Sequence, residues 1–267
     1  MKTIRTTCPY CGVGCGVLAS VDDAGRVSVR GDDQHPANLG RLCVKGAALG
    51  ETTGLAGRLL APEVDGQKVT WPQALAETAS RLQQVIDQHG PQAVAFYASG
   101  QLLTEDYYAA NKLMKGFIGA ANIDTNSRLC MSSAVTGYKR AFGADVVPCS
   151  YEDVENSDLV VLVGSNAAWA HPVLYQRLAQ AKRDNPRLQI VAIDPRRTAT
   201  CEIADRHLAL APGSDGGLFV GLLNALAQAG ACVDGFRDGA QALAEASGWD
   251  VAKVADFCGL AADEVAG

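Results

Sequence analysis

The sequence predicts an α/β protein in which a small amino-terminal domain precedes a larger domain built on a parallel sheet. The first 57 residues contain a cysteine-rich loop and a hairpin pattern. From Trp71 onward, short apolar runs alternate with amphipathic stretches. Strands that alternate with helices usually form a parallel sheet covered on both faces. We therefore expect one domain at residues 1–57 and a second at residues 58–267.

Length and composition exclude several classes of protein. The chain has 267 residues, enough for one large or two small domains. Its net charge is −6 and it has no basic run, which argues against a nucleic-acid partner. Every apolar stretch is too short to span a membrane. No secretory signal or twin arginine follows Met1, so we expect a cytoplasmic protein without a membrane partner.

Four cysteines near the start have the spacing of metal ligands: Cys8, Cys11, Cys15 and Cys43. Two, three and then twenty-seven residues separate them. Such a triplet with a distant fourth cysteine suits a [4Fe–4S] cluster. The glycines at 12, 14 and 16 let the backbone curl around it. A zinc site usually shows two C-x2-C pairs, and disulfides fit an exported protein better, but both remain alternatives.

A hairpin is predicted between the cysteine triplet and Cys43. Residues 16–21 and 26–30 alternate apolar and polar side chains around an Asp-Asp-Ala-Gly turn. A domain this small has little core of its own, so we expect the cluster to stabilise it.

The second domain is predicted to contain four strands separated by helices. We expect helices over 71–89, from Thr104, over 172–184 and from about 215 to 229, and strands at 93–98, 158–163, 188–193 and 207–210. Residues 261–267 have the pattern of a helix just beginning, and we expect this chain to be the amino-terminal part of a longer, truncated polypeptide.

Each predicted strand runs into a loop of Gly, Ser, Asn, Asp or Arg residues. These are also ordinary turn residues. In a Rossmann-like parallel sheet, ligands bind at the carboxyl ends of the strands. Four such loops at one edge therefore predict a site for a nucleotide-like ligand.

Three motifs resemble one enzyme family. They are C-P-Y-C-G-V-G-C-G from Cys8, C-V-K-G from Cys43 and N-S-R-L-C-M-S-S-A-V from Asn126. Together they resemble the bis-molybdopterin guanine dinucleotide oxidoreductases, and within that family most closely the bacterial assimilatory nitrate reductases. The family enzymes are far longer than this chain, and the resemblance covers all of it.

The resemblance implies a role for each matching residue. Cys8, Cys11, Cys15 and Cys43 match the cluster ligands, Cys130 matches the thiolate that binds molybdenum, and Lys45 matches a lysine between cluster and pterin, on a proposed electron path. The positions that match contacts to the pterin and its guanosine end are Gln101, Asn126, Gly164, Ser165, Asn166, His171, Asp194, Arg196, Thr198, Gly213, Ser214 and Asp215.

Some of these residues have a plain structural alternative. Taken alone, Cys130 reads as a buried small hydrophobe, whereas at a helix start after residue 130 its thiolate would be stabilised. His171 is either a helix cap or a cofactor contact. Cys201, Cys232 and Cys258 are expected to be buried thiols, and Cys149 lies on a loop without an assigned function.

The implied activity is reduction of nitrate to nitrite, with electrons passing from a [4Fe–4S] cluster to molybdenum on bis-molybdopterin guanine dinucleotide. The implied partner is an electron donor such as ferredoxin, flavodoxin or a flavoprotein subunit. A formate dehydrogenase of the same family is the nearest alternative, although those enzymes typically carry histidine where Met131 stands. A periplasmic nitrate reductase and a non-catalytic iron–sulfur subunit are further alternatives.

Overall fold

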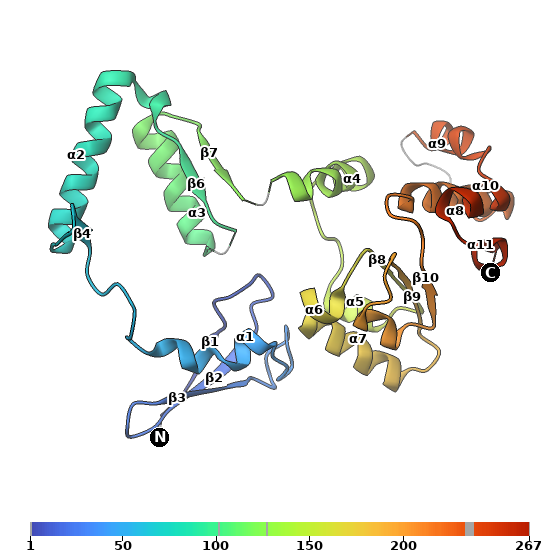
Figure 1. The fold of residues 1–267 in the computed structure, drawn as a ribbon, viewed down its shortest axis with the longest axis horizontal. Helices are drawn as coiled ribbons and strands as arrows, with labels where there is room; N and C mark the ends of the chain where they lie inside the picture. Colours follow the sequence, from blue (N-terminus) through green and yellow to red (C-terminus); the bar gives the residue numbers. More distant parts are fainter. Residues whose placement is uncertain (1, 101, 127, 233–237, 267) are drawn as a thin grey trace. The chain divides into compact units, whose positions relative to one another are not determined.

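A computed structural model describes residues 2–100, 102–126, 128–232 and 238–266. It divides into two compact units. Figure 1 shows the helices and strands, coloured along the chain from blue at the amino-terminal end to red at the carboxyl-terminal end. The first unit comprises Met1–Gly31 and Val44–Val146, and the second comprises Asp32–Cys43 and Val147–Gly267. None of the helices in the described ranges has the length and apolar character needed to cross a bilayer.

The first unit begins with an antiparallel sheet in the order β1-β2-β3. Its elements are β1 (Lys2–Thr7), β2 (Gly16–Val21) and β3 (Val27–Gly31), followed by α1 (Val44–Ala47) and the 3-10 turn η1 (Leu49–Thr53). The predicted hairpin is therefore confirmed as β2–β3. In its turn, the Asp22 carboxylate accepts hydrogen bonds from the backbone N–H groups of Ala24 and Arg26, at 2.9 and 2.8 Å. Strand β1 was not predicted, because its residues are all exposed and give no apolar pattern.

The rest of the first unit packs helices against a short parallel pair of strands. Its elements are β4 (Glu63–Val64), β5 (Gln67–Lys68), α2 (Trp71–His89), η2 (Pro91–Ala93), β6 (Phe96–Ala98), α3 (Thr104–Asn111), the π-helix η3 (Lys112–Ile118), β7 (Ile123–Thr125), η4 (Leu129–Met131) and α4 (Ser132–Phe142). The predicted helix over 71–89 is confirmed. Thr70 and Gln73 form a capping box at its start, and Gly90, with φ 81°, ends it.

Strand β6 corrects one prediction. Residues 93–98 were expected to form a buried strand in the same sheet as 158–163. Instead, β6 pairs in parallel with β7, and Phe96 and Tyr97 are 40% and 77% exposed. The run of apolar residues over 93–98 does not reveal this exposure. Its buried members, Val94 and Ala98, lie on either side of the exposed aromatic residues.

The second unit contains a three-stranded parallel sheet in the order β10-β9-β8. Its elements are α5 (Tyr151–Glu155), β8 (Leu159–Val163), α6 (Ala167–Ala170), α7 (Pro172–Asp184), β9 (Gln189–Ile193), η5 (Ala199–Ile203), β10 (Arg206–Leu208), α8 (Asp215–Gln228), α9 (Gly239–Ala246), α10 (Val251–Cys258) and α11 (Ala262–Ala266). The strands and helices predicted over 158–229 are thus confirmed, with bounds shifted by a few residues.

Two apolar clusters hold this sheet between helices. On one side Leu178 of α7 packs with Leu188 and Ile190. On the other, Ile193 and Leu208 pack with residues of α8 and α10. The sequence predicted a sheet buried on both faces. This is correct for β9. It is not correct for β8, where exposed and half-buried residues alternate.

Because β6 belongs to the first unit, the expected single sheet edge with four loops is wrong. Three strand ends share one sheet, and the fourth strand pairs elsewhere.

The packing of α8 on α10 gives a stability prediction. A methyl group at Gly221 would overlap the side chain of Val254, whereas one at Gly216 on the same helix would meet nothing within 4 Å. We expect Gly221→Ala to lower the free energy of unfolding by about 1–3 kcal/mol because the core is overpacked. Gly216→Ala is the matched control and should stay within about 1 kcal/mol of wild type. Thermal unfolding of both variants checks this, and equal midpoints would contradict the α8–α10 packing.

Candidate functional site

The cysteine triplet lies on a closed loop between β1 and β2. The backbone N–H of Cys8 donates to the carbonyl oxygen of Cys15 at 2.8 Å, and that of Gly14 donates to Cys11 at 3.2 Å. Gly14 has φ +62°, a conformation that favours glycine. Cys15 is buried, Cys8 is half-buried and Cys11 is exposed. The loop therefore holds three sulfur donors within eight residues.

The chemistry of this donor set separates the alternatives. All nine cysteines lie within the described ranges, and none of them forms a disulfide there. The disulfide alternative is thus not realised in the structure. Among the residues described, no three or more His, Cys, Asp or Glu side chains are arranged to hold a single metal ion. Thiol donors on a tight loop are the ligand type that iron–sulfur clusters use.

Lys45 lies in α1, two residues after Cys43. Its ammonium nitrogen is 5.7 Å from the centroid of the Tyr10 ring, within the range of a cation–π interaction. Tyr10 stands between the first two cysteines of the triplet, so this contact holds the lysine beside the cysteine loop. The role of Lys45 was implied by the family resemblance, but its contact with Tyr10 was not predicted from the sequence.

Asn126 and Cys130 follow the end of β7. Because β6 and β7 are parallel, their carboxyl ends meet, and a Cβ at Gly100 would lie 3.1 Å from the side-chain oxygen of Asn126. Gln101 lies outside the described residues. Helix α4 begins at Ser132, as predicted, and Cys130 lies in the turn η4 directly before it. Cys130 is exposed, so it is not the buried small hydrophobe of the alternative. Its thiol thus stands in the turn that leads into the amino terminus of α4.

Residues 164–166 form the loop after β8. Gly164, with φ +55°, donates its N–H to the carbonyl of Ile193 at 2.8 Å, which ties this loop to the end of β9. Thr200, only 1% exposed, accepts a hydrogen bond from Ala168 N–H at 3.1 Å and donates to the Asn166 side chain at 3.4 Å. Sequence reasoning missed Thr200, which no motif marks.

The loop after β9 brings three predicted residues together. The Asp194 carboxylate, 8% exposed, accepts a hydrogen bond from the N–H of Arg196 at 2.8 Å. The Arg196 side chain is exposed. The hydroxyl oxygen of Thr198 is buried and lacks a hydrogen-bond partner among the described residues. Buried hydroxyls normally have partners, so this one suits a ligand that supplies the bond.

The loop before α8 holds the last predicted group. Gly213 has φ +83°, and the Ser214 hydroxyl donates to the Ala211 carbonyl at 2.6 Å. Asp215 is the first residue of α8, a 14-residue helix. Ser214 is 3% exposed, so its hydroxyl serves the loop rather than the surface.

His171 and the remaining cysteines have simpler positions. The His171 side chain is exposed and makes no capping hydrogen bond, although its backbone carbonyl accepts from Tyr175 at 2.9 Å. Burial raises the pKa of Tyr175, and its hydroxyl donates to the carbonyl oxygen of Ala199 at 3.2 Å.

The remaining cysteines were expected to be buried or on a loop. Cys201 and Cys258 are buried as expected, at 3% and 0% exposure. Cys232 is only half-buried, which corrects its prediction, because it follows the end of α8 rather than lying within a helix. Cys149 is exposed on a loop.

Comparison with known proteins identifies both parts of the chain. The family described as molybdopterin oxidoreductase matches residues 58–232, and the molybdopterin oxidoreductase Fe4S4 domain matches residues 1–53.

Two curated relatives are nitrate reductases. A nitrate reductase of Klebsiella oxytoca is 80% identical over 266 residues, which cover 100% of this chain and 31% of that protein. A periplasmic nitrate reductase of Desulfovibrio desulfuricans is 44% identical over 220 residues, covering 80% of this chain and 29% of that protein. The chain thus spans about a third of the length of these relatives. Among solved structures, acetylene hydratase from Pelobacter acetylenicus shares the fold, with a TM-score of 0.84 at 22% identity over 99% of this chain and 38% of that one.

The buried hydroxyl of Thr200 gives a prediction for the strand-end loops. Thr200→Val removes both hydrogen bonds at constant shape and leaves Ala168 N–H without its acceptor. We expect a loss of about 1–3 kcal/mol in the free energy of unfolding. Thr200→Ser keeps the hydroxyl and is the matched control. If thermal unfolding finds the valine variant as stable as the serine variant, Thr200 does not tie the loops together.

Proposed function

The chain belongs to the molybdopterin oxidoreductase family, and from this membership we propose that it forms part of an enzyme that reduces nitrate to nitrite. The observation that carries the proposal is the 80% identity to a nitrate reductase along the whole chain. Identity at this level supports the same reaction, NO3− + 2H+ + 2e− → NO2− + H2O. The cofactors of the family are an iron–sulfur cluster and a molybdenum–pterin group.

The cysteine loop fits the iron–sulfur cluster. Cys8, Cys11 and Cys15 would supply three thiolate ligands, and Cys43 would supply the fourth. A bound cluster supplies one-electron transfer. The hydrogen bond from Cys8 to Cys15 fixes both ends of the loop, so its thiols would be held in place before the cluster arrives. The positive charge of Lys45, kept near the loop by Tyr10, would offset the negative charge of the thiolates.

The residues at the strand ends fit a pterin carrying guanosine. Thr198 presents a buried hydroxyl that has no hydrogen-bond partner among the described residues. The buried carboxylate of Asp194 lies four residues earlier in the same loop. Carboxylates accept the N–H groups of guanine, and the exposed guanidinium of Arg196 suits a phosphate. The remaining residues proposed to contact the cofactor are Gln101, Asn126, Gly164, Ser165, Asn166, His171, Gly213, Ser214 and Asp215.

Cys130 is the residue that we propose to ligate molybdenum. When bound, that metal supplies the two-electron chemistry that takes an oxygen atom from the substrate. The thiol is exposed in the turn directly before α4, so it is accessible to a metal.

The proposal also covers the domain boundary, the electron donor and the cellular compartment. We place the cluster domain at residues 1–57 and the pterin domain from residue 58. We expect the electron donor to be ferredoxin, flavodoxin or a flavoprotein subunit, and the compartment to be the cytoplasm. Fractionation of the source cells, with detection of the protein in each fraction, checks the compartment.

An anaerobic assay of the complete natural polypeptide tests the proposed reaction. With reduced methyl viologen as the electron source, we expect nitrate-dependent oxidation of the dye and formation of nitrite. Formate oxidation should be absent. Formate turnover without nitrate turnover would instead make the protein a formate dehydrogenase. Iron without molybdenum in the purified protein would make it an electron-transfer subunit.

A pair of cysteine variants supplies the control for this assay. Cys130→Ala should abolish nitrate reduction while the iron content stays at the wild-type level, because only the proposed molybdenum ligand is lost. Cys149→Ala removes another exposed cysteine and should leave activity unchanged. Full activity of Cys130→Ala would refute the ligand assignment.

A further inference from the structure

The segment Asp32–Cys43 belongs to the second unit, although the chain before and after it belongs to the first. The segment is compact. The N–H of Gly40 donates to the carbonyl of Asp32 and that of Leu39 donates to His35, both at 2.9 Å. The fully buried Asn38 side chain donates to the carbonyl of Arg41 at 2.8 Å. This segment, here called the Cys43 loop, is therefore cross-linked by its own hydrogen bonds and ends at Cys43.

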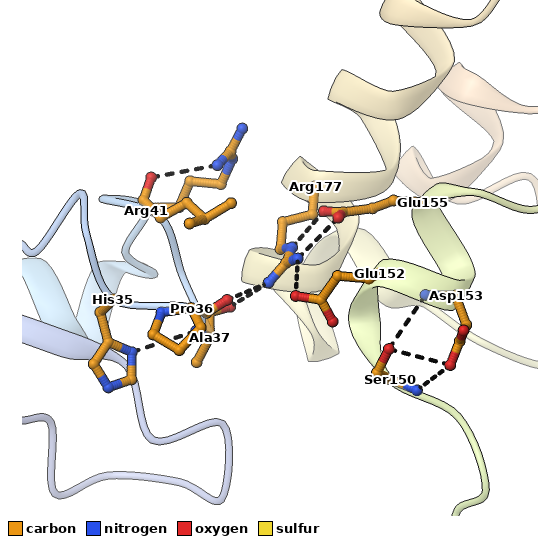
Figure 2. A network of polar contacts seen from close by, with 10 residues as sticks. His35, Pro36, Ala37, Arg41, Ser150, Glu152, Asp153, Glu155 and Arg177 are labelled. Atoms are coloured by element: carbon orange, nitrogen blue, oxygen red, sulfur yellow. Dashed lines mark hydrogen bonds and ion pairs between the residues drawn. The ribbon is translucent and has the colours of Figure 1, made fainter.

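Arg177 of α7 connects the Cys43 loop to the α/β sheet. One terminal nitrogen of its guanidinium donates to the carbonyl oxygens of Pro36 and Ala37, at 2.7 and 3.0 Å (Figure 2). The Arg177 side chain is 1% exposed. The structure thus buries a guanidinium in order to hold two backbone carbonyls of one loop.

The other donors of Arg177 are taken up by α5. Glu155 accepts two of them, one from Nε and one at 2.9 Å, and Glu152 accepts another at 3.5 Å. Figure 2 shows these carboxylates on the side of the guanidinium away from Pro36 and Ala37. Hydrogen bonds to Glu155 raise the pKa of Arg177 above its ordinary value, so it stays charged.

All five N–H donors of Arg177 are used in this arrangement, three by carboxylates and two by the loop. A lysine has three donors from a single point and cannot bridge α5 and the loop in the same way. The ring of Tyr151, 5.0 Å from the guanidinium carbon, lies against the same group. The site therefore requires an arginine in particular.

We propose that Arg177 is a positioning residue for Cys43. The proposal rests on the assignment of Cys43 as a cluster ligand. Ala37 is six residues before Cys43, and the Asn38–Arg41 bond carries the restraint toward it. Arg177 lies on the helix that begins directly after His171, a residue proposed to contact the pterin. One side chain thus fixes the fourth cluster ligand to the element that leads from the pterin loop.

The test compares iron retention in variants of the complete natural polypeptide, purified anaerobically. Arg177→Lys keeps the charge and loses the bridge. Arg177→Met combined with Glu155→Gln removes the bridge without leaving the half-buried Glu155 carboxylate unpaired, so it guards against simple misfolding. Arg183→Lys changes an exposed arginine of the same helix, whose side chain donates to Gln180 of α7, and is the matched control.

Two measurements distinguish positioning from general stability. The first is the rate at which iron is released to a ferrous-ion chelator, and the second is the electron paramagnetic resonance spectrum of the dithionite-reduced protein. We expect both Arg177 variants to release iron about tenfold faster or more, as loss of an outer-shell partner commonly weakens a metal site, and to show an altered spectrum. The Arg183 variant should match wild type, and circular dichroism should be unchanged in all three.

Each outcome decides between the two claims. Cys43→Ala is included because it tests the ligand assignment itself. Wild-type iron content in Cys43→Ala would overturn that assignment, and the positioning role with it. Iron loss in Cys43→Ala together with wild-type release rates and spectra in both Arg177 variants would overturn the positioning role alone. Faster release in the control Arg183 variant as well would also overturn it, because the effect would then belong to α7 in general.

Discussion

Arg177 places a positive charge inside the second unit, where an unpaired ion would cost far more than a hydrogen bond returns. The charge is tolerated because every N–H of the guanidinium meets an acceptor, on α5 or on the Cys43 loop. A hydrogen bond to a charged group typically contributes about 1.5–3 kcal/mol. The Cys43 loop consequently belongs to the second unit, whereas the chain on either side of it belongs to the first. The proposed fourth cluster ligand is thus placed by a residue more than a hundred positions away in sequence.

A second constraint acts at the carboxyl ends of β8 and β9. Gly164 bonds to the end of β9, and Thr200 bonds back toward the loop that follows β8. These bonds are made entirely within the protein, so they shape the loops whether or not a ligand is bound. The hydroxyl of Thr198 differs, because it is buried without a partner among the described residues. Thr200 therefore shapes the loops, whereas the Thr198 hydroxyl is available to a cofactor.

The sequence predicted the elements with strong local signals. The start and end of α2, the hairpin turn at Asp22 and the start of α7 at Pro172 all appear where expected. Sequence failed where long-range pairing decides the outcome. The pairing of β6 with β7 depends on a three-residue strand too short to give a periodic signal. The roles of Arg177 and Thr200 likewise depend on partners distant in sequence, which composition and spacing do not report. The cysteine motif was readable because three of its four cysteines lie within eight residues.

Hydrogen exchange over the Cys43 loop tests the central claim most directly. In the complete natural polypeptide, the amides of Leu39 and Gly40 should be protected in wild type and should exchange much faster in Arg177→Met/Glu155→Gln. Amides within β9 should keep their protection in both proteins. This result would show that the Arg177 contacts, rather than the internal bonds of the loop, keep it ordered. Equal protection of Leu39 and Gly40 in the two proteins would contradict the account.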